Sequence, residues 1–190
     1  QQGTWTVRVD QNGRERILHP KHIVMSTGIS GAPRTPEYPG LESFTGEWCH
    51  SSEYRDGRRY AGKRVVVLGT GNSAHDVAQD VYMAGAESVT MVQRGSTTVV
   101  SVEPGAFLGD AVYHEGNTVE NSDLIANSLP YPVLLRQRQL LTAQARELDR
   151  EMLEGLERIG FKLDFGIDES GHEMKYMRRG GGYYMNVGCS

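Results

Sequence analysis

Apolar and polar residues alternate along residues 4–9 with the period of two that is typical of a β-strand. A polar turn at residues 10–13 separates this stretch from Arg16-Ile17-Leu18, so the pattern predicts a β-hairpin or meander near the start of the chain. A short apolar run over residues 22–25 then leads into a segment with several prolines, Pro33, Pro36 and Pro39. Prolines at this density disfavour both helices and central strands, which predicts a linker.

A β-α-β unit is predicted over residues 64–92. Residues 64–68 read Arg-Val-Val-Val-Leu, a β-branched run typical of a strand buried in a parallel sheet. Apolar residues then recur at spacings of three and four from Ala74 to Val81, which predicts a helix that ends at Gly85. Residues 88–92 predict a second strand, parallel to the first. We expect a doubly wound α/β sheet with strand 64–68 in its centre.

The second half of the chain has less regular patterning. Residues 96–127 are rich in glycine and acidic residues and predict a loop with one short strand at 98–100. Residues 131–159 carry leucines at helical spacing and predict a long helical region, in which a break is compatible with the pattern. After Gly160 the pattern indicates short strand-like pieces.

Composition and charge narrow the classes of function. The net charge is -4, and this argues against a nucleic-acid partner, which usually selects a basic surface. The mean hydropathy of -0.48 predicts a soluble, cytoplasmic protein without a membrane span. Cys49 and Cys189 lie far apart and have no metal-ligand spacing, so we expect reduced thiols. The first residues show no secretion signal. The histidines are scattered, and no metal site is predicted.

A dinucleotide-binding motif, G-x-G-x-x-A, stands between the first predicted strand and its helix. Its residues are Gly69, Thr70, Gly71, Asn72, Ser73 and Ala74. The first glycine permits a tight turn, the second lets the backbone approach a pyrophosphate, and the small third residue lets the helix pack on the strand. The pyrophosphate is then bound by the amides at the helix N-terminus. Because strand, turn, helix and second strand occur in the right order, the motif predicts a nucleotide site of the Rossmann type.

The end of the second predicted strand indicates which nucleotide binds. Gln93, Arg94 and Ser96 stand where an NAD-specific site usually places Asp or Glu for the ribose 2′-hydroxyl. A guanidinium offers charge and planar donors to a 2′-phosphate, whereas a carboxylate would repel it. The residues therefore predict NADPH as the ligand.

A second motif precedes this unit and carries a family resemblance. Four residues follow the pattern F-x-G-x-x-x-H-x-x-x-(F/Y/W): Phe44, Gly46, His50 and Tyr54. This signature resembles that of class B flavin-dependent monooxygenases, which include flavin-containing and Baeyer-Villiger monooxygenases. The proline-rich segment before it and the glycine motif after it resemble that family's order. For Phe44, His50 and Tyr54, packing or turn-fixing roles are favoured over a direct role in proton transfer.

The resemblance implies FAD and NADPH as cofactors, and O2 and a small organic molecule as substrates. The flavin would be reduced by NADPH and would oxygenate the substrate through a C4a-hydroperoxide. The family's first G-x-G-x-x-G, which binds FAD, is absent here. We therefore expect that this chain alone neither holds FAD tightly nor turns over, and we assign no catalytic residue.

The same resemblance implies a domain organisation. Residues 1–40 are expected to belong to the FAD domain, residues 41–59 to form a linker with the signature, residues 60–163 to form the NADP-binding domain with a helical region at 130–159, and residues 164–190 to return to the FAD domain. Two alternatives stay open, namely another flavoprotein reductase with two dinucleotide-binding domains and a non-catalytic NADPH-binding module.

Overall fold

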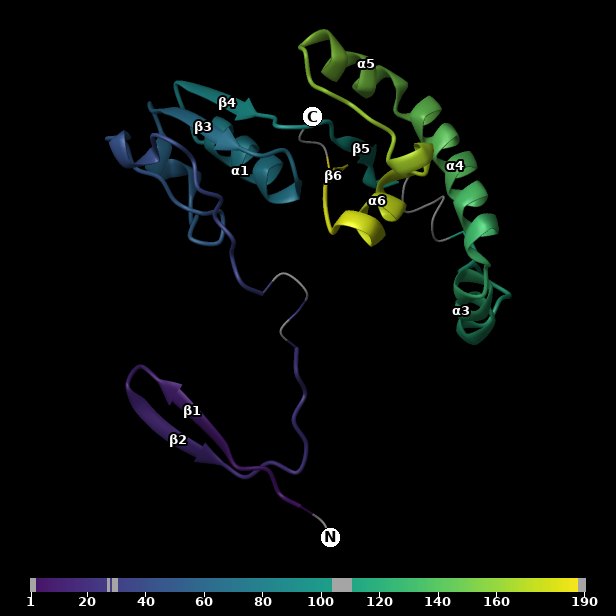
Figure 1. The fold of residues 1–190 in the computed structure, drawn as a ribbon, viewed down its shortest axis with the longest axis horizontal. Coiled ribbons are helices and arrows are strands. Elements are labelled where there is room, and N and C mark those ends of the chain that lie inside the picture. Colours follow the sequence, from purple (N-terminus) through teal and green to yellow (C-terminus); the bar gives the residue numbers. More distant parts are fainter. Residues whose placement is uncertain (1–2, 27, 29–30, 104–110, 188–190) are drawn as a thin grey trace. The chain divides into compact units, whose positions relative to one another are not determined.

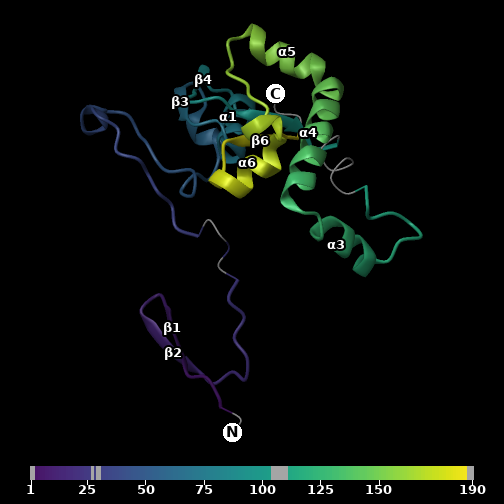
Figure 2. The same cartoon turned by 45° about the vertical axis from the view of Figure 1, so that its right-hand side comes forward.

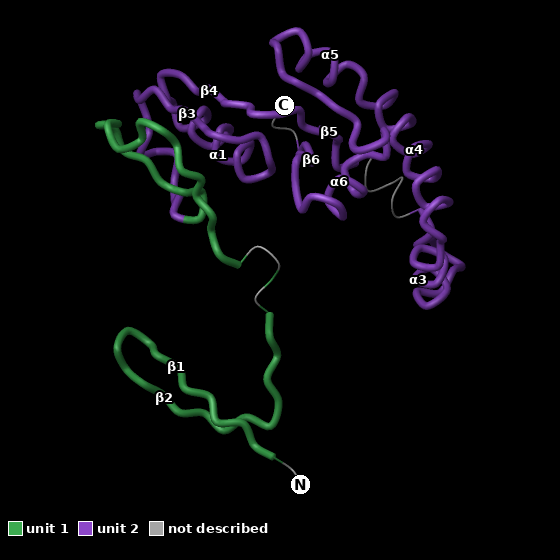
Figure 3. The backbone as a smooth tube through the Cα atoms, viewed as in Figure 1, with its two compact units in different colours: residues 1–52 green, residues 53–190 purple. Residues whose placement is uncertain are grey.

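The structure, a computed structural model, describes residues 3–26, 28, 31–103 and 111–187 of the chain. Cys189 and part of the predicted loop 96–127 lie outside these residues. The chain divides into two compact units, residues 1–52 and 53–190, which Figure 3 colours separately.

The elements are named in Figure 1. In chain order the described elements are β1 (Val7–Gln11), β2 (Arg14–Leu18), η1 (Leu41–Ser43), η2 (Gly57–Tyr60), β3 (Arg64–Leu68), α1 (Asn72–Met83), β4 (Ser88–Val92), β5 (Thr98–Ser101), α3 (Val119–Asn127), α4 (Tyr131–Leu148), α5 (Arg150–Arg158), η3 (Ile167–Glu169), α6 (Gly171–Arg179) and β6 (Tyr183–Asn186).

Unit 1 contains the predicted β-hairpin. Strands β1 and β2 pair antiparallel, with Val7 opposite Leu18. The two residues between them, Asn12 and Gly13, have φ angles of 54° and 79°. Positive φ at both positions is the turn that matches the twist of a hairpin, and Asn-Gly is the sequence that adopts it most readily. The hairpin prediction is confirmed, and the turn chemistry sets its register.

Unit 2 begins with the predicted β-α-β arrangement. Strands β3 and β4 pair parallel, with Arg64 opposite Ser88 and Leu68 opposite Val92. Helix α1 connects them and packs against both. Because a parallel pair needs a crossover connection, the helix between the strands follows from their order along the chain. The prediction of two parallel strands joined by a helix is confirmed.

The larger sheet that the sequence predicts is not found among the described residues. Their strands form three two-stranded sheets, β1-β2, β3-β4 and β5-β6, so β3 is not a central strand. After β4 the chain leaves the first sheet, and β5 pairs parallel with β6, with Thr98 opposite Tyr183. Unit 2 is therefore a mixed α/β structure with small parallel sheets, and a full doubly wound sheet is not seen in the described part.

The predicted helical region 131–159 consists of two helices, α4 and α5, separated by the break that its hydrophobic pattern allowed. Asp149 lies between α4 and α5, and its carboxylate accepts a hydrogen bond from the amide of Ser101 at 2.9 Å. The apolar side of α5 supplies Leu153 and Leu156 to the core, where they pack with Val99 of β5 and Tyr184 of β6. The helical region thus covers the second parallel sheet.

Two helices stand where the sequence predicted none. Residues 119–127 form α3, whose apolar side chains Val119 and Leu124 are exposed and give no amphipathic pattern. Residues 171–179 form α6, which lies beside α4 in Figures 1 and 2 and contacts it. Its buried side chains include Lys175, so its pattern lacked an apolar stripe. The loop prediction for 119–127 and the strand-like prediction for 171–179 are wrong for this reason.

Candidate functional site

The glycine motif forms the turn between β3 and α1. Gly69 has a φ angle of 126°, which L side chains rarely adopt, and its amide donates to the carbonyl of Val92 at 3.0 Å. A Cβ atom at Gly69 would lie 3.9 Å from Cβ of Ala74, so the first residues of the helix come close to the end of the strand. Gly69 is therefore required by the backbone conformation itself.

Gly71 differs from Gly69, because its own backbone does not require a glycine. Its φ and ψ angles are -88° and -177°, an extended conformation that any residue can adopt. The nearest atom that an added Cβ would meet is the carbonyl oxygen of Tyr183, at 3.9 Å. The structure therefore leaves open space at the position where the motif expects close approach of a ligand.

The first turn of α1 offers hydrogen-bond donors beside that space. The amides of Ala74 and His75 both donate to the carbonyl of Gly71, at 3.0 and 3.1 Å. The amides of Asn72 and Ser73, by contrast, have no acceptor within the described part of the chain. Unsatisfied amides and the positive end of the helix dipole together favour an anion. The turn fits the pyrophosphate of a dinucleotide.

The side chains of Thr70 and Asn72 bind the protein itself. The amide oxygen of Asn72 accepts a hydrogen bond from the backbone of Met185 in β6, at 3.0 Å. The hydroxyl of Thr70 lies 2.6 Å from the hydroxyl of Thr97. The glycine turn is thus connected to β6 and to the segment before β5.

Among the predicted residues after β4, Arg94 alone is without a partner in the described structure. The side chain of Gln93 is bound to the backbone of Lys162. The hydroxyl of Ser96 is hydrogen-bonded to the carboxylate of Asp164. Arg94 is exposed and has no hydrogen bond or ion pair to any described residue. Its guanidinium is therefore available for a ligand.

The first three residues of the signature motif lie in unit 1. A Cβ atom at Gly46 would lie 2.5 Å from the tip of the Phe44 ring, so the ring occupies the space where a side chain would stand. Nδ1 of His50 accepts a hydrogen bond from the amide of Ser52 at 3.1 Å and lies 2.9 Å from its hydroxyl. These contacts are local ones, within the turn that contains the motif.

The last residue of the motif, Tyr54, lies in unit 2 and binds helix α1. Its hydroxyl donates to the carboxylate of Asp80 at 2.5 Å, and the amide of Gly57 donates to the same carboxylate oxygen at 2.8 Å. Partial burial, together with the hydrogen bond to Asp80, raises the pKa of the Tyr54 phenol. Tyr54 therefore stays protonated and attaches the end of the signature to helix α1.

A buried ion pair that the sequence pattern did not reveal lies beside the candidate site. Nζ of Lys175 is 2.5 Å from the carboxylate of Asp164, and the hydroxyl of Thr98 donates to that carboxylate at 2.6 Å. Burial raises the pKa of Asp164, but the hydrogen bonds from Lys175, Thr98 and Ser96 outweigh it and lower the pKa to about 2. No spacing along the chain connects these residues, so no sequence pattern indicates the pair.

A second missed residue, His75, lies on α1 itself. Its ring stacks on that of Tyr184 in β6, with 3.6 Å between centroids and 1° between planes. Its Nε2 has no hydrogen-bond partner among the described residues. Burial lowers the pKa of His75, and the nearby Asp76 offsets this only in part. His75 is therefore a neutral packing residue.

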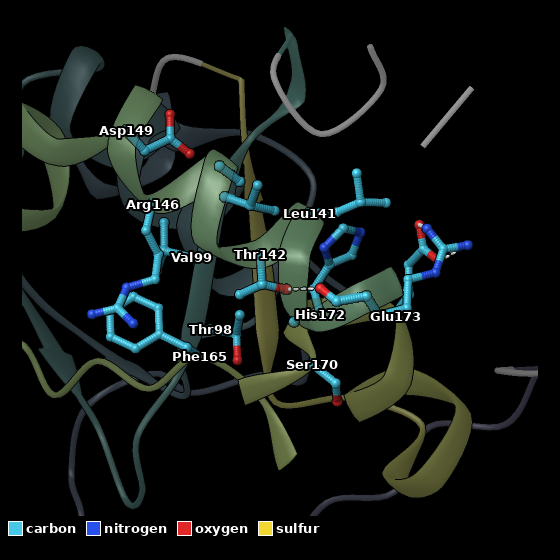
Figure 4. Close-up of a pocket in the computed structure, with 14 residues that line it drawn as sticks. Thr98, Val99, Leu141, Thr142, Arg146, Asp149, Phe165, Ser170, His172 and Glu173 are labelled. Atoms are coloured by element: carbon cyan, nitrogen blue, oxygen red, sulfur yellow. Dashed lines mark hydrogen bonds and ion pairs between the residues drawn. The ribbon is translucent and has the colours of Figure 1, made fainter. Parts of the chain in front are cut away.

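A small cavity lies elsewhere in unit 2, between β5, α4 and α6 (Figure 4). Its volume is about 50 Å³, enough for a few water molecules and far too small for a dinucleotide. The Arg138–Glu173 ion pair, at 2.7 Å, and Arg146, whose guanidinium lies over the Phe165 ring, contribute to its wall. The cavity is a packing space apart from the glycine turn.

The described residues contain no group of three or more His, Cys, Asp or Glu side chains that could hold a metal ion. None of their helices is long and apolar enough to cross a membrane.

Comparison with known proteins decides the family. Residues 1–144 match the flavin-binding monooxygenase-like family, which is more than half of the chain. The chain belongs to this family. Membership implies FAD and NADPH as cofactors and supports the monooxygenase interpretation over the reductase one.

Several relatives carry monooxygenase names. The chain is 41% identical over 101 residues to indole-3-pyruvate monooxygenase YUCCA1 of Oryza sativa subsp. japonica, which covers 53% of this chain and 24% of that protein. It is 30% identical over 142 residues to dimethylaniline monooxygenase [N-oxide-forming] 2 of Rattus norvegicus, and the match covers 73% of this chain and 26% of that protein. It is 45% identical over 73 residues to trimethylamine monooxygenase of Pelagibacter ubique (strain HTCC1002), and the match covers 38% of this chain and 16% of that protein. The chain thus spans about a quarter or less of the length of these relatives.

Proposed function

We propose that this chain supplies the NADPH-binding part of an FAD-dependent monooxygenase. The observation that carries the proposal is the glycine turn. It has two helix amides without acceptors among the described residues, open space over Gly71 and an exposed Arg94 at the end of the neighbouring strand. The pyrophosphate of NADPH would bind to the amides of Asn72 and Ser73, and its 2′-phosphate to Arg94. Ala74 would keep the helix close to the strand.

The proposed reaction inserts one oxygen atom from O2 into a small organic molecule. The flavin supplies this chemistry through a C4a-hydroperoxide after NADPH has reduced it, and this chain positions the nicotinamide nucleotide. The names of the relatives refer to amines and a 2-oxo acid, so the proposal names the substrate by class only. In the proposed organisation, residues 60–163 bind NADPH, residues 41–59 form the linker, and residues 1–40 and 164–190 belong to the FAD domain.

The Gly71→Ala variant tests the proposal, because it adds one methyl group where only a ligand would collide with it. The unliganded fold accepts this group, since the backbone is extended and the nearest atom is 3.9 Å away. We expect NADPH affinity of the natural protein, measured by calorimetry, to fall roughly tenfold or more while the melting temperature stays unchanged.

The matched control is Gly155→Ala, in helix α5. It makes the same chemical change away from the turn, and alanine suits a helix interior better than glycine does. We expect its NADPH affinity to equal that of the wild type. NADPH binding by Gly71→Ala with wild-type affinity would contradict the proposed site.

A further inference from the structure

The orientation of the Gln93 amide is fixed by the backbone of one residue. The Lys162 amide is a donor, so the atom of Gln93 that lies 2.7 Å from it must be the oxygen. The nitrogen of Gln93 then donates to the Lys162 carbonyl at 2.8 Å. Its second hydrogen points to the hydroxyl of Thr97, at 3.2 Å. Gln93 therefore acts on Thr97 only as a donor.

The hydrogen of the Thr97 hydroxyl must consequently go elsewhere. Thr97 is 2% exposed, and the other described hydroxyl within reach is that of Thr70, at 2.6 Å. If Thr70 donated to Thr97, the Thr97 hydrogen would be buried without an acceptor, at a cost of about 1–3 kcal/mol. The favoured direction is therefore Gln93 to Thr97 to Thr70.

This direction has a consequence for the glycine turn. The hydroxyl of Thr70 accepts from Thr97, so its own hydrogen is directed away from Thr97. Thr70 is half-buried, and no other described residue forms a hydrogen bond with its hydroxyl. Thr70 stands between the two glycines of the turn and directly precedes Gly71, where an added Cβ atom would meet no atom closer than 3.9 Å. A donor in this place suits an oxygen of a phosphate group.

We infer that Gln93 and Thr97 are positioning residues that orient the Thr70 hydroxyl as a donor to the pyrophosphate of the nucleotide. The inference rests on the proposed NADPH site and extends it, because Gln93 then acts on the ligand through two hydroxyl groups and does not touch it. A fixed donor binds more tightly than a freely rotating one, since less orientational freedom is lost on binding.

The test is a double-mutant cycle in the natural full-length protein, with NADPH and NADH as ligands in calorimetry. Thr70→Val removes the donor and should weaken binding roughly ten- to hundredfold. Thr97→Val leaves the donor unoriented and should weaken binding roughly two- to tenfold. In the Thr70→Val background, Thr97→Val should have no further effect, because the group that it orients is absent. Both ligands should lose equal affinity, since the pyrophosphate is common to both.

Two controls separate positioning from folding. Thr97→Ser keeps the hydroxyl and should bind as the wild type does. Thr90→Val makes the same change on the exposed side of β4 and should also bind normally. Should Thr97→Val fail to fold, Thr97→Cys replaces it, because a thiol is a weak donor of similar size.

The outcomes distinguish this inference from the proposed function. A wild type that binds NADPH, with Thr70→Val binding equally well, would overturn the inference and leave the NADPH site standing. Additive effects of the two valine variants would overturn the orienting role of Thr97. A wild type that binds no NADPH would overturn both the inference and the proposed function.

Discussion

Two neighbouring residues at the end of β4 have different surroundings. The amide of Gln93 is bound on both sides to the backbone of Lys162, whereas Arg94 is exposed without a described partner. The sequence predicted both residues as contacts to the nucleotide, because both follow the strand. It does not show that Gln93 forms hydrogen bonds with a residue 69 positions away. If the chain binds NADPH as proposed, we expect the choice between NADPH and NADH to depend on Arg94.

We expect the Arg94→Ala variant to lose most of its preference for NADPH over NADH. Charge-assisted hydrogen bonds to a 2′-phosphate are worth on the order of 1–3 kcal/mol, and NADH cannot form them. Calorimetry with both nucleotides measures the preference directly. Arg64→Ala, at the opposite end of β3, removes the same charge and serves as the control. An unchanged ratio of the two affinities in Arg94→Ala would refute the role of Arg94.

Elements were predictable where their stabilising contacts are local. Strand β3, helix α1 and strand β4 follow one another directly. A β-branched run identified β3, apolar residues at spacings of three and four identified α1, and the strand-like residues after Gly85 identified β4. Helix α6 was not predictable, because the charge on its buried Lys175 is compensated by Asp164, outside the helix. The pairing of β5 with β6 was equally hidden, since their residues lie more than eighty positions apart.

One buried carboxylate lies at the break between α4 and α5. Asp149 is 6% exposed and accepts the amide of Ser101 in β5. In Asp149→Ala that amide loses its acceptor, and we expect the free energy of unfolding, measured with urea, to fall by about 1–3 kcal/mol. Asp149→Asn keeps an acceptor oxygen and should lose less. Equal stability of Asp149→Ala and the wild type would show that the contact contributes nothing.

At the scale of unit 2, helix α1, which follows the glycine motif, is connected to the last described strand, β6. The ring of His75 stacks on Tyr184, and the side chain of Asn72 accepts a hydrogen bond from Met185. The glycine motif was predictable from sequence, but these contacts depend on which strand passes beside the helix. The part of the site contributed by β6 is therefore a property of the folded unit.

The His75 contact makes stability depend on pH. The folded state lowers the pKa of His75 below its ordinary value of 6.5, so folding favours the neutral ring. The stabilisation is complete above pH 6.5 and is lost as the pH falls through the lowered pKa. His75→Phe keeps a flat ring without a titrating group, so we expect its urea stability to change less below pH 6.5. Burial also lowers the pKa of His172, so this residue accounts for the pH dependence of the unfolding free energy that remains in His75→Phe. If the unfolding free energy of His75→Phe depended on pH as strongly as that of the wild type, His75 would be excluded as the source of the dependence.

The separation of β5 from β6 also has a consequence for the order in which the chain folds. The segment between β5 and β6 is roughly four times as long as that between β3 and β4, which adds about 1 kcal/mol to the entropy cost of closing the loop. During synthesis at about 5–20 residues per second, β6 follows β5 after about 4–17 s, whereas β4 follows β3 after only about 1–5 s. Pulse-labelling hydrogen exchange should therefore protect the amides of β3 and β4 before those of β5; simultaneous protection would mean that the helices hold β5 in place before β6 arrives.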